Sequence, residues 1–283
     1  MAIYFTESGL EHRDGVRPHY LLVHGLGGAR QQWRGVQHAL GVSCYSIAVD
    51  VPGFGESRGE QRFEVHQAAE QIAQFCRDRG LEGYILVSHS IGSTVAGILA
   101  AHPQVRFRRV ILVSGSLFRA SAIAQRPLSG LHAPKLTLAV ASQFLAGSVP
   151  VSARTRHLLA TSELARTVAL WPFVAQPAEL DPQTLADSLE GSGSPAVLRV
   201  LLDSKHIDYV RIMARIPQPV DLVWGARDRL ISEADIQTAR LVLDVRRTRE
   251  IADCGHWPMV EHTKELVSLL RTWGEDDDAE TGT

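Results

Sequence analysis

The stretch YILVSHSIG, residues 84–92, decides how the rest of the sequence is interpreted. An apolar run, Tyr84–Val87, leads through two residues to Ser90, and a helix-like segment follows it. Ser88 and Gly92, two positions to either side of Ser90, are both small. A turn from strand to helix this sharp strains the backbone of its central residue and tolerates only small neighbours. The pattern therefore predicts an exposed hydroxyl at a helix N-terminus, where backbone N–H groups stabilise negative charge.

Short apolar runs alternate with helix-like segments in the regions around this turn. The runs are nearly continuously apolar, which is typical of parallel strands covered on both faces. The expected strands are Tyr20–Val23, Tyr45–Val49, Tyr84–Val87, Val110–Val113, Val220–Trp224 and Thr248–Ile251. The expected helices are Gln31–Leu40, Phe63–Arg79, Ile91–Ala101, Glu233–Leu243 and Thr263–Trp273. This alternation predicts an α/β fold with a mainly parallel, doubly wound sheet.

The alternation is interrupted between residues 117 and 206, where we expect no strand. Structureless loops of this length are rare, so the sequence predicts an inserted helical cap. Its candidate helices are Lys135–Ala146, Ala153–Leu170, Pro182–Glu190 and Pro195–Ser204. We expect residues 1–116 and 207–274 to form the α/β core, residues 117–206 the cap, and residues 275–283 an acidic disordered tail.

Composition excludes several classes of protein. Of the 283 residues, 45% are apolar and 21% are charged, as in an ordinary globular enzyme. The net charge of -2 gives no electrostatic reason to expect a nucleic-acid partner. No apolar run approaches the roughly 20 residues that span a bilayer, and the first residues do not resemble a signal peptide. We expect a cytoplasmic protein without a membrane partner, and the rarity of lysine beside arginine suggests a bacterial source.

The cysteines and histidines indicate neither a disulfide framework nor a metal centre. Cys44, Cys76 and Cys254 lie far apart and form no CxxC pair, and no HExxH motif occurs. We expect no metal and no cofactor, and a small molecule as the substrate. The sequence leaves the oligomeric state open.

A serine hydroxyl is a poor nucleophile unless a base accepts its proton and an acid orients that base. The segment DCGHWP, residues 253–258, places His256 in a turn after the last expected strand. Asp228 lies on the loop that follows Val220–Trp224, at the end of the strand where α/β sites are found. We therefore expect His256 to be the base and Asp228 the acid, with Arg227 and Arg229 keeping Asp228 ionised.

Other residues compete for these roles. Asp50 also ends a strand, where a carboxylate can simply cap a turn, while Asp253 and Glu261 lie close to His256 in sequence. The small-x-Ser-x-small pattern recurs at Ser194, but no strand precedes it. Ser90 itself could be an ordinary helix N-cap. Two further histidines are expected to have supporting roles. His24 is expected to brace the turn that carries it, and His89 to flank the nucleophile.

Five segments together resemble the α/β-hydrolase superfamily. They occur in the family's order, from about residue 3 to residue 273: HGLGG at 24–28 with Trp33 beyond, DVPGFGES at 50–57, SHSIG at 88–92, WGARD at 224–228 and DCGHWP at 253–258. The resemblance implies a nucleophile elbow at Ser90 and an oxyanion hole formed by the backbone N–H groups of Leu26 and Ile91. Relatives that dehalogenate haloalkanes or open epoxides carry aspartate where this chain has Ser90.

We expect a serine hydrolase that cleaves an ester or thioester of a small to medium, largely apolar substrate through an acyl-enzyme. The candidate substrate-binding residues are Trp33, Phe144, Leu145, Trp171, Phe173 and Trp257. The same triad could instead serve acyl transfer, cyclisation or C–C bond cleavage. A non-covalent lyase or cyclase, or a ligand receptor on the same fold, also stays open.

Overall fold

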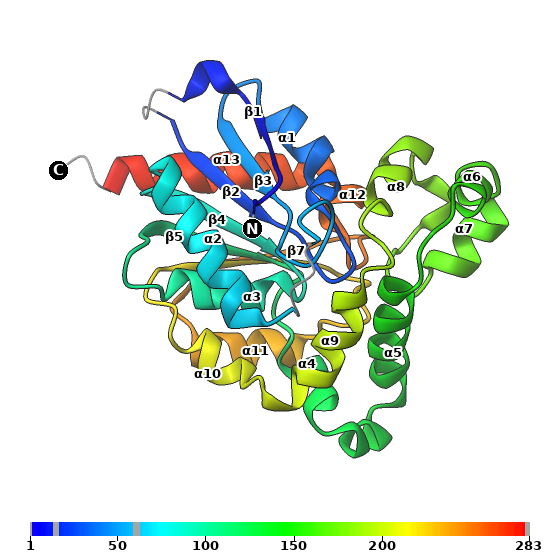
Figure 1. The fold of residues 1–283 in the computed structure, drawn as a ribbon. Coiled ribbons are helices and arrows are strands. Elements are labelled where there is room, and N and C mark those ends of the chain that lie inside the picture. Colours follow the sequence, from blue (N-terminus) through cyan, green and yellow to red (C-terminus); the bar gives the residue numbers. More distant parts are fainter. Residues whose placement is uncertain (1, 14–16, 59–62, 281–283) are drawn as a thin grey trace.

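A computed structural model describes residues 2–13, 17–58 and 63–280, and its strands form one sheet (Figure 1). The strand order is β1-β3-β2-β4-β5-β6-β7. Their bounds are β1 Phe5–Ser8, β2 His19–Val23, β3 Tyr45–Val49, β4 Tyr84–His89, β5 Phe107–Val113, β6 Val220–Gly225 and β7 Val245–Ile251. Strand β1 pairs antiparallel with β3, and the other neighbouring strands pair in parallel. The expected mainly parallel sheet is confirmed.

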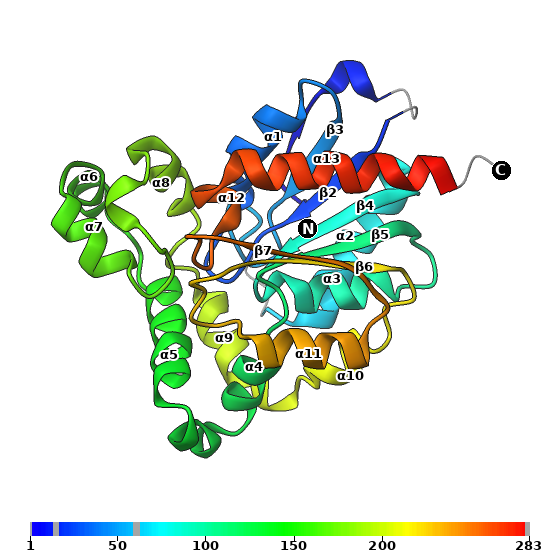
Figure 2. The same ribbon diagram turned by 180° about the vertical axis from the view of Figure 1, so that it is seen from behind.

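Helices cover both faces of the sheet because the strand side chains alternate between two apolar cores. In β2, Leu21 and Val23 pack into one core, whereas Tyr20 and Leu22 pack into the other. The first core is covered by α2 (Val65–Arg79), α3 (Gly92–Ala100), α10 (Tyr209–Met213) and α11 (Glu233–Val242). The second is covered by α1 (Arg34–Leu40), α12 (Pro258–Glu261) and α13 (Thr263–Glu280), which Figure 2 shows from their own side.

The segment between β5 and β6 is helical, as expected, and lies beside the carboxyl ends of the parallel strands (Figure 1). Between residues 117 and 206 its α-helices are α4 Phe118–Gln125, α5 Pro134–Ser148, α6 Ala153–Thr161, α7 Glu163–Leu170, α8 Pro182–Ser188 and α9 Pro195–Asp203. We expected α6 and α7 to be one helix. Ser162 separates them because its backbone is extended and its side chain accepts a hydrogen bond from the N–H of Ala165, which caps α7.

The C-terminal helix is longer than expected. We expected a helix to end at Trp273 before a disordered acidic tail at 275–283, but α13 continues through Glu280. Adding a residue to a formed helix is far easier than starting one. Gly274 lies within the helix and not at its end, and it packs so close to Tyr20 that a Cβ would come within 2.4 Å of the Tyr20 hydroxyl. Residues 281–283 lie outside the described residues.

No helix in the described ranges is long and apolar enough to cross a membrane.

Candidate active site

Ser90 stands at the turn between β4 and α3 in a strained backbone conformation, with φ of 52°. The turn is so tight that a Cβ on Gly92 would come within 2.2 Å of the carbonyl oxygen of His24. On the other side Ser88 is completely buried, and its hydroxyl donates to that of Ser93 over 3.3 Å. The packing thus explains why small residues flank Ser90, as the sequence pattern required.

The structure brings Ser90, His256 and Asp228 together. The Ser90 Oγ lies 2.8 Å from His256 Nε2, and His256 Nδ1 lies 2.7 Å from Asp228 Oδ2. Both the imidazole and the carboxylate are fully buried. If Nδ1 carries the proton and donates it to the carboxylate, Nε2 is left free to accept the proton of the serine hydroxyl. This arrangement is suited to activating Ser90 as a nucleophile.

Asp228 is held by backbone N–H groups rather than by its arginine neighbours. Its Oδ1 accepts hydrogen bonds from Leu230 N at 2.8 Å and Ile231 N at 3.1 Å. Arg227 instead pairs with Asp253, and the Arg229 guanidinium lies 4.9 Å from the ring centroid of Trp171. Among the described residues neither arginine forms an ion pair with Asp228, and the expectation that they keep it ionised stays a prediction. Two N–H donors stabilise a carboxylate without a cation.

Glu261 holds the loop that carries His256, a role that the sequence did not reveal. Its Oε2 accepts from Gly255 N at 2.9 Å and from Ala175 N at 2.7 Å, and its Oε1 accepts from Trp257 N at 3.1 Å. Burial raises the pKa of Glu261, although these bonds oppose the shift. We had set Glu261 aside because it lies close to His256 in sequence, and that closeness is what lets it bond the loop backbone.

His89, at the end of β4, packs against the same loop. Its Nε2 lies 2.9 Å from the carbonyl oxygen of His256, and the two rings are 5.0 Å apart between centroids. A carbonyl only accepts, so Nε2 carries a proton. Burial, and secondarily the charge of His256, hold the pKa of His89 well below its usual value. His89 is thus a neutral donor that fixes the backbone beneath His256.

His24 braces its own turn, as expected. Its Nδ1 lies 2.8 Å from the carbonyl oxygen of Gly25, and Val51 N donates to its Nε2 over 3.0 Å. Burial lowers the pKa of His24. Both contacts fit a neutral ring that is protonated at Nδ1.

The alternative acid and the alternative serine have structural roles elsewhere. Asp50 is buried and accepts from Arg30 N at 2.7 Å, Arg30 Nη1 at 2.6 Å and Glu56 N at 2.8 Å, so it caps a turn. Ser194 caps α9 by accepting from Ala196 N at 3.1 Å, and its hydroxyl donates to the carbonyl of Gly53 over 2.6 Å.

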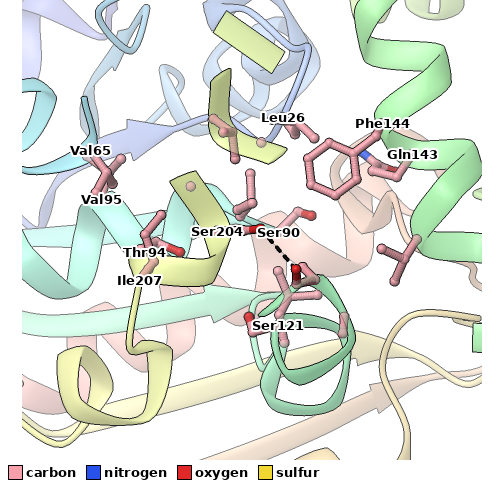
Figure 3. A pocket seen from close by; sticks show the side chains of 18 of the residues that line it. Leu26, Val65, Ser90, Thr94, Val95, Ser121, Gln143, Phe144, Ser204 and Ile207 are labelled. Atoms are coloured by element: carbon pink, nitrogen blue, oxygen red, sulfur yellow. Dashed lines mark hydrogen bonds between the residues drawn. The ribbon is translucent and has the colours of Figure 1, made fainter. Parts of the chain in front are cut away.

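An apolar cavity opens beside Ser90 (Figure 3). Its walls come from the loops after β2, β3, β4 and β6 and from α4, α5 and α9. Apolar side chains on these walls include Phe54, Phe63, Ala120, Val140, Val200 and Leu230. None of the described residues that line it is Asp, Glu, Lys or Arg. An uncharged, apolar group therefore fits this cavity, because a buried charge would find no partner there.

Of the residues expected to bind substrate, Phe144 lines this cavity and five do not. Trp33 is completely buried in the second core. Phe173 and Trp257 stack on each other with centroids 5.9 Å apart and belong to that same core. Leu145 and Trp171 are exposed to solvent. Apolar character alone did not indicate which side of a helix or loop faces Ser90.

Leu26 and Ile91, the two residues expected to form an oxyanion hole, both line the cavity. Within the part of the chain that the structure describes, neither backbone N–H donates a hydrogen bond to another residue. Ile91 directly precedes α3, where backbone N–H groups lack acceptors within the helix.

Comparisons with known proteins agree with this architecture. The alpha/beta hydrolase fold family matches residues 18–263. A pimeloyl-[acyl-carrier protein] methyl ester esterase of Neisseria meningitidis is 25% identical over 93% of this chain and 95% of its own. Monoacylglycerol lipase abhd6-B of Xenopus laevis is 22% identical over 91% and 75% of the respective chains. The solved enol-lactonase of Burkholderia xenovorans superposes with a TM-score of 0.63 at 16% identity, covering 95% and 94%.

The buried histidines predict how stability depends on pH. In the unfolded chain His89 titrates near 6.5, but its pKa in the folded protein is well below that value. The unfolded state therefore binds more protons, and stability falls as the pH drops below about 6.5. Replacing His89 by Gln keeps an N–H donor but removes the titration. We expect the slope of unfolding free energy against pH to fall by up to about 1.4 kcal/mol per pH unit.

Urea denaturation at several pH values between about 5 and 7 measures this slope. His38, an exposed histidine on α1, supplies the matched control His38→Gln. Equal slopes in wild type and His89→Gln would contradict the assignment of a buried neutral His89.

Proposed function

The chain belongs to the alpha/beta hydrolase fold family, and we propose that it is a serine ester hydrolase in which Ser90 is the nucleophile, His256 the base and Asp228 the acid. One observation carries the proposal: Ser90, which His256 links to Asp228 by hydrogen bonds, lines an apolar cavity without charged side chains in its described lining. A nucleophile, its base and an orienting acid beside a water-poor pocket are what acyl transfer requires. Two matched relatives act on esters, as their names state.

In the first half of the proposed reaction, Ser90 Oγ attacks the carbonyl carbon of the ester while His256 Nε2 takes its proton. The N–H groups of Leu26 and Ile91 stabilise the oxyanion that forms, because both residues line the cavity and, within the described residues, neither N–H has another acceptor. His256 then gives its proton to the departing alcohol or thiol, and the acyl group remains on Ser90. Asp228 keeps the His256 ring in the required tautomer throughout.

In the second half, water enters and His256 removes its proton as it attacks the acyl-enzyme. The acid product leaves and Ser90 recovers its proton. Because the cavity is apolar, we propose an aliphatic or otherwise uncharged acyl group as its occupant. The helices between β5 and β6 act as the cap that closes the cavity, with α4, α5 and α9 contributing side chains to it.

Acyl transfer, cyclisation or C–C cleavage through the same triad is the second candidate, since each would also begin with an activated Ser90. The cytoplasmic location and the bacterial source expected from the sequence stay predictions.

Removing the nucleophile tests the proposal. We expect Ser90→Ala to fold normally but to lose hydrolysis of p-nitrophenyl butyrate by about 10⁴-fold or more, because the acyl-enzyme cannot form. Ser194→Ala is the control: it removes a helix cap and costs about 1 kcal/mol of stability but leaves kcat/KM near the wild-type value. Near-wild-type turnover by Ser90→Ala would show that the nucleophile is misassigned.

Substituting Asp228 and Asp50 in turn distinguishes a catalytic carboxylate from a structural one. We expect Asp228→Asn to lower kcat by about 10³- to 10⁴-fold, because an amide would favour the wrong tautomer of His256. Asp50→Asn should instead lower stability and spare kcat, since Asp50 binds Arg30 and a turn backbone. Both variants are assayed with the same ester at a temperature where each is fully folded. An active Asp228→Asn together with an inactive Asp50→Asn would reverse the assignment.

A further inference from the structure

Helix α5, Pro134–Ser148, is apolar on both of its sides. Its side toward the cavity carries Val140 and Phe144, which line the wall beside Ser90. Its opposite side carries Leu138 and Leu145, which are 58% and 67% exposed. The only charged residue of α5 is Lys135, in its first turn. A surface helix normally places charged or polar residues on its outer face, whereas the outer face of α5 exposes apolar side chains to water.

Helix α9, Pro195–Asp203, repeats this arrangement next to α5. Val200 lines the cavity, whereas Leu198, Leu201 and Leu202 are exposed. The two helices pack together: a Cβ on Gly147 of α5 would come within 3.2 Å of the Val197 side chain of α9, and Figure 1 shows the helices side by side. Because both turn one side to the cavity, their leucines lie on the outside of the cap. We call this surface the leucine face; it comprises Leu138 and Leu145 of α5, Leu198, Leu201 and Leu202 of α9, and the exposed Leu131, which shortly precedes α5 in the chain.

Basic residues lie near the leucines of the leucine face in the sequence. Residues 117–162, which include α4, α5 and α6, contain no Asp or Glu, although the whole chain has a net charge of -2. The basic residues of this stretch are Arg119, Arg126, Lys135, Arg154 and Arg156. Exposed cations stand close to the leucines along the chain: Arg126 and Lys135 around Leu131, and Lys205 after α9. The surface thus combines aliphatic side chains with cations.

We propose that the leucine face docks on the surface of a bilayer that contains anionic lipids. Leucine side chains inserted at the level of the head groups would be removed from water. Arg126, Lys135 and Lys205 would interact electrostatically with the lipid phosphates. A second copy of the chain fits less well, because a two-fold interface would place this basic surface against itself. An acidic protein fits less well too, since the face lacks the aromatic residues that concentrate at protein interfaces.

Docking of this kind would differ from one sequence expectation. We expected no membrane partner because no segment is long enough to span a bilayer, but a protein that lies on the surface needs no spanning helix. The position of the face also matters, since α5 and α9 separate it from the cavity beside Ser90 by the thickness of one helix. A lipid-borne ester would then be delivered to the same helices that line the cavity. The docking itself does not depend on the chemistry proposed for Ser90.

Vesicle flotation with the full chain tests the proposal. We expect binding to vesicles of phosphatidylcholine with about one third phosphatidylglycerol, weaker binding to phosphatidylcholine alone, and release by high salt. The double variant Leu138→Glu/Leu145→Glu should bind the anionic vesicles at least about 100-fold more weakly, because each buried leucine contributes about tenfold or more. Arg126→Gln and Lys135→Gln should each weaken binding about fivefold.

Leu241→Glu is the matched control, because Leu241 is 89% exposed on α11, a helix that contributes no residue to the leucine face. It should bind vesicles like the wild type. Hydrolysis of soluble p-nitrophenyl butyrate, measured on the same samples, reports folding and the Ser90 chemistry separately. The proposal is overturned if the wild type binds neither vesicle, or if the double variant binds as well as Leu241→Glu. It is also overturned if light scattering shows a wild-type dimer that the double variant converts to monomer, since a second copy would then cover the face.

Discussion

The backbone of Ser90 has a φ of 52°, and the geometry of the site depends on the packing that keeps it there. An L-residue adopts this conformation at a cost, so neighbouring atoms must fix it from several sides. Gly92 lies against the carbonyl of His24, and a Cβ on Gly25 would come within 3.1 Å of the Ser90 Cβ. The turn places the Ser90 hydroxyl 2.8 Å from His256 Nε2, and both Ser90 and Ile91 line the cavity. Bulkier residues at either glycine would move the nucleophile.

The loop that carries His256 is also held in place, in this case by several hydrogen bonds to its backbone. Glu261 accepts hydrogen bonds from the residues on both sides of His256, and His89 donates to its carbonyl. The N–H of His256 itself donates to the carbonyl of Phe173, over 2.6 Å, which links the loop to the helical insertion. A base must stay within hydrogen-bond reach of its nucleophile, and small displacements are costly. These backbone contacts, rather than the triad side chains alone, set the 2.8 Å distance to Ser90.

Local patterns in the sequence predicted the sheet and the residues that meet beside it, because each depends on a few neighbouring positions. The small residues around Ser90 and the turns that carry Asp228 and His256 are of this kind. The cavity wall was harder to predict: α5 is apolar all round, so its sequence could not distinguish Phe144, which faces Ser90, from the exposed Leu145. Glu261 was missed for a different reason, since its partners are backbone N–H groups that no side-chain pattern reveals.

The central claim is that Ser90 is a nucleophile activated by His256, and a fluorophosphonate tests it most directly. Phosphonylation needs an activated hydroxyl and a site for the developing oxyanion, so it reproduces the acylation step. Intact-mass measurement followed by peptide mapping should find one adduct per chain, on Ser90, and none in His256→Ala under the same conditions. The account would be contradicted by a folded wild type that takes no adduct, by an adduct on another residue, or by labelling that persists unchanged in His256→Ala.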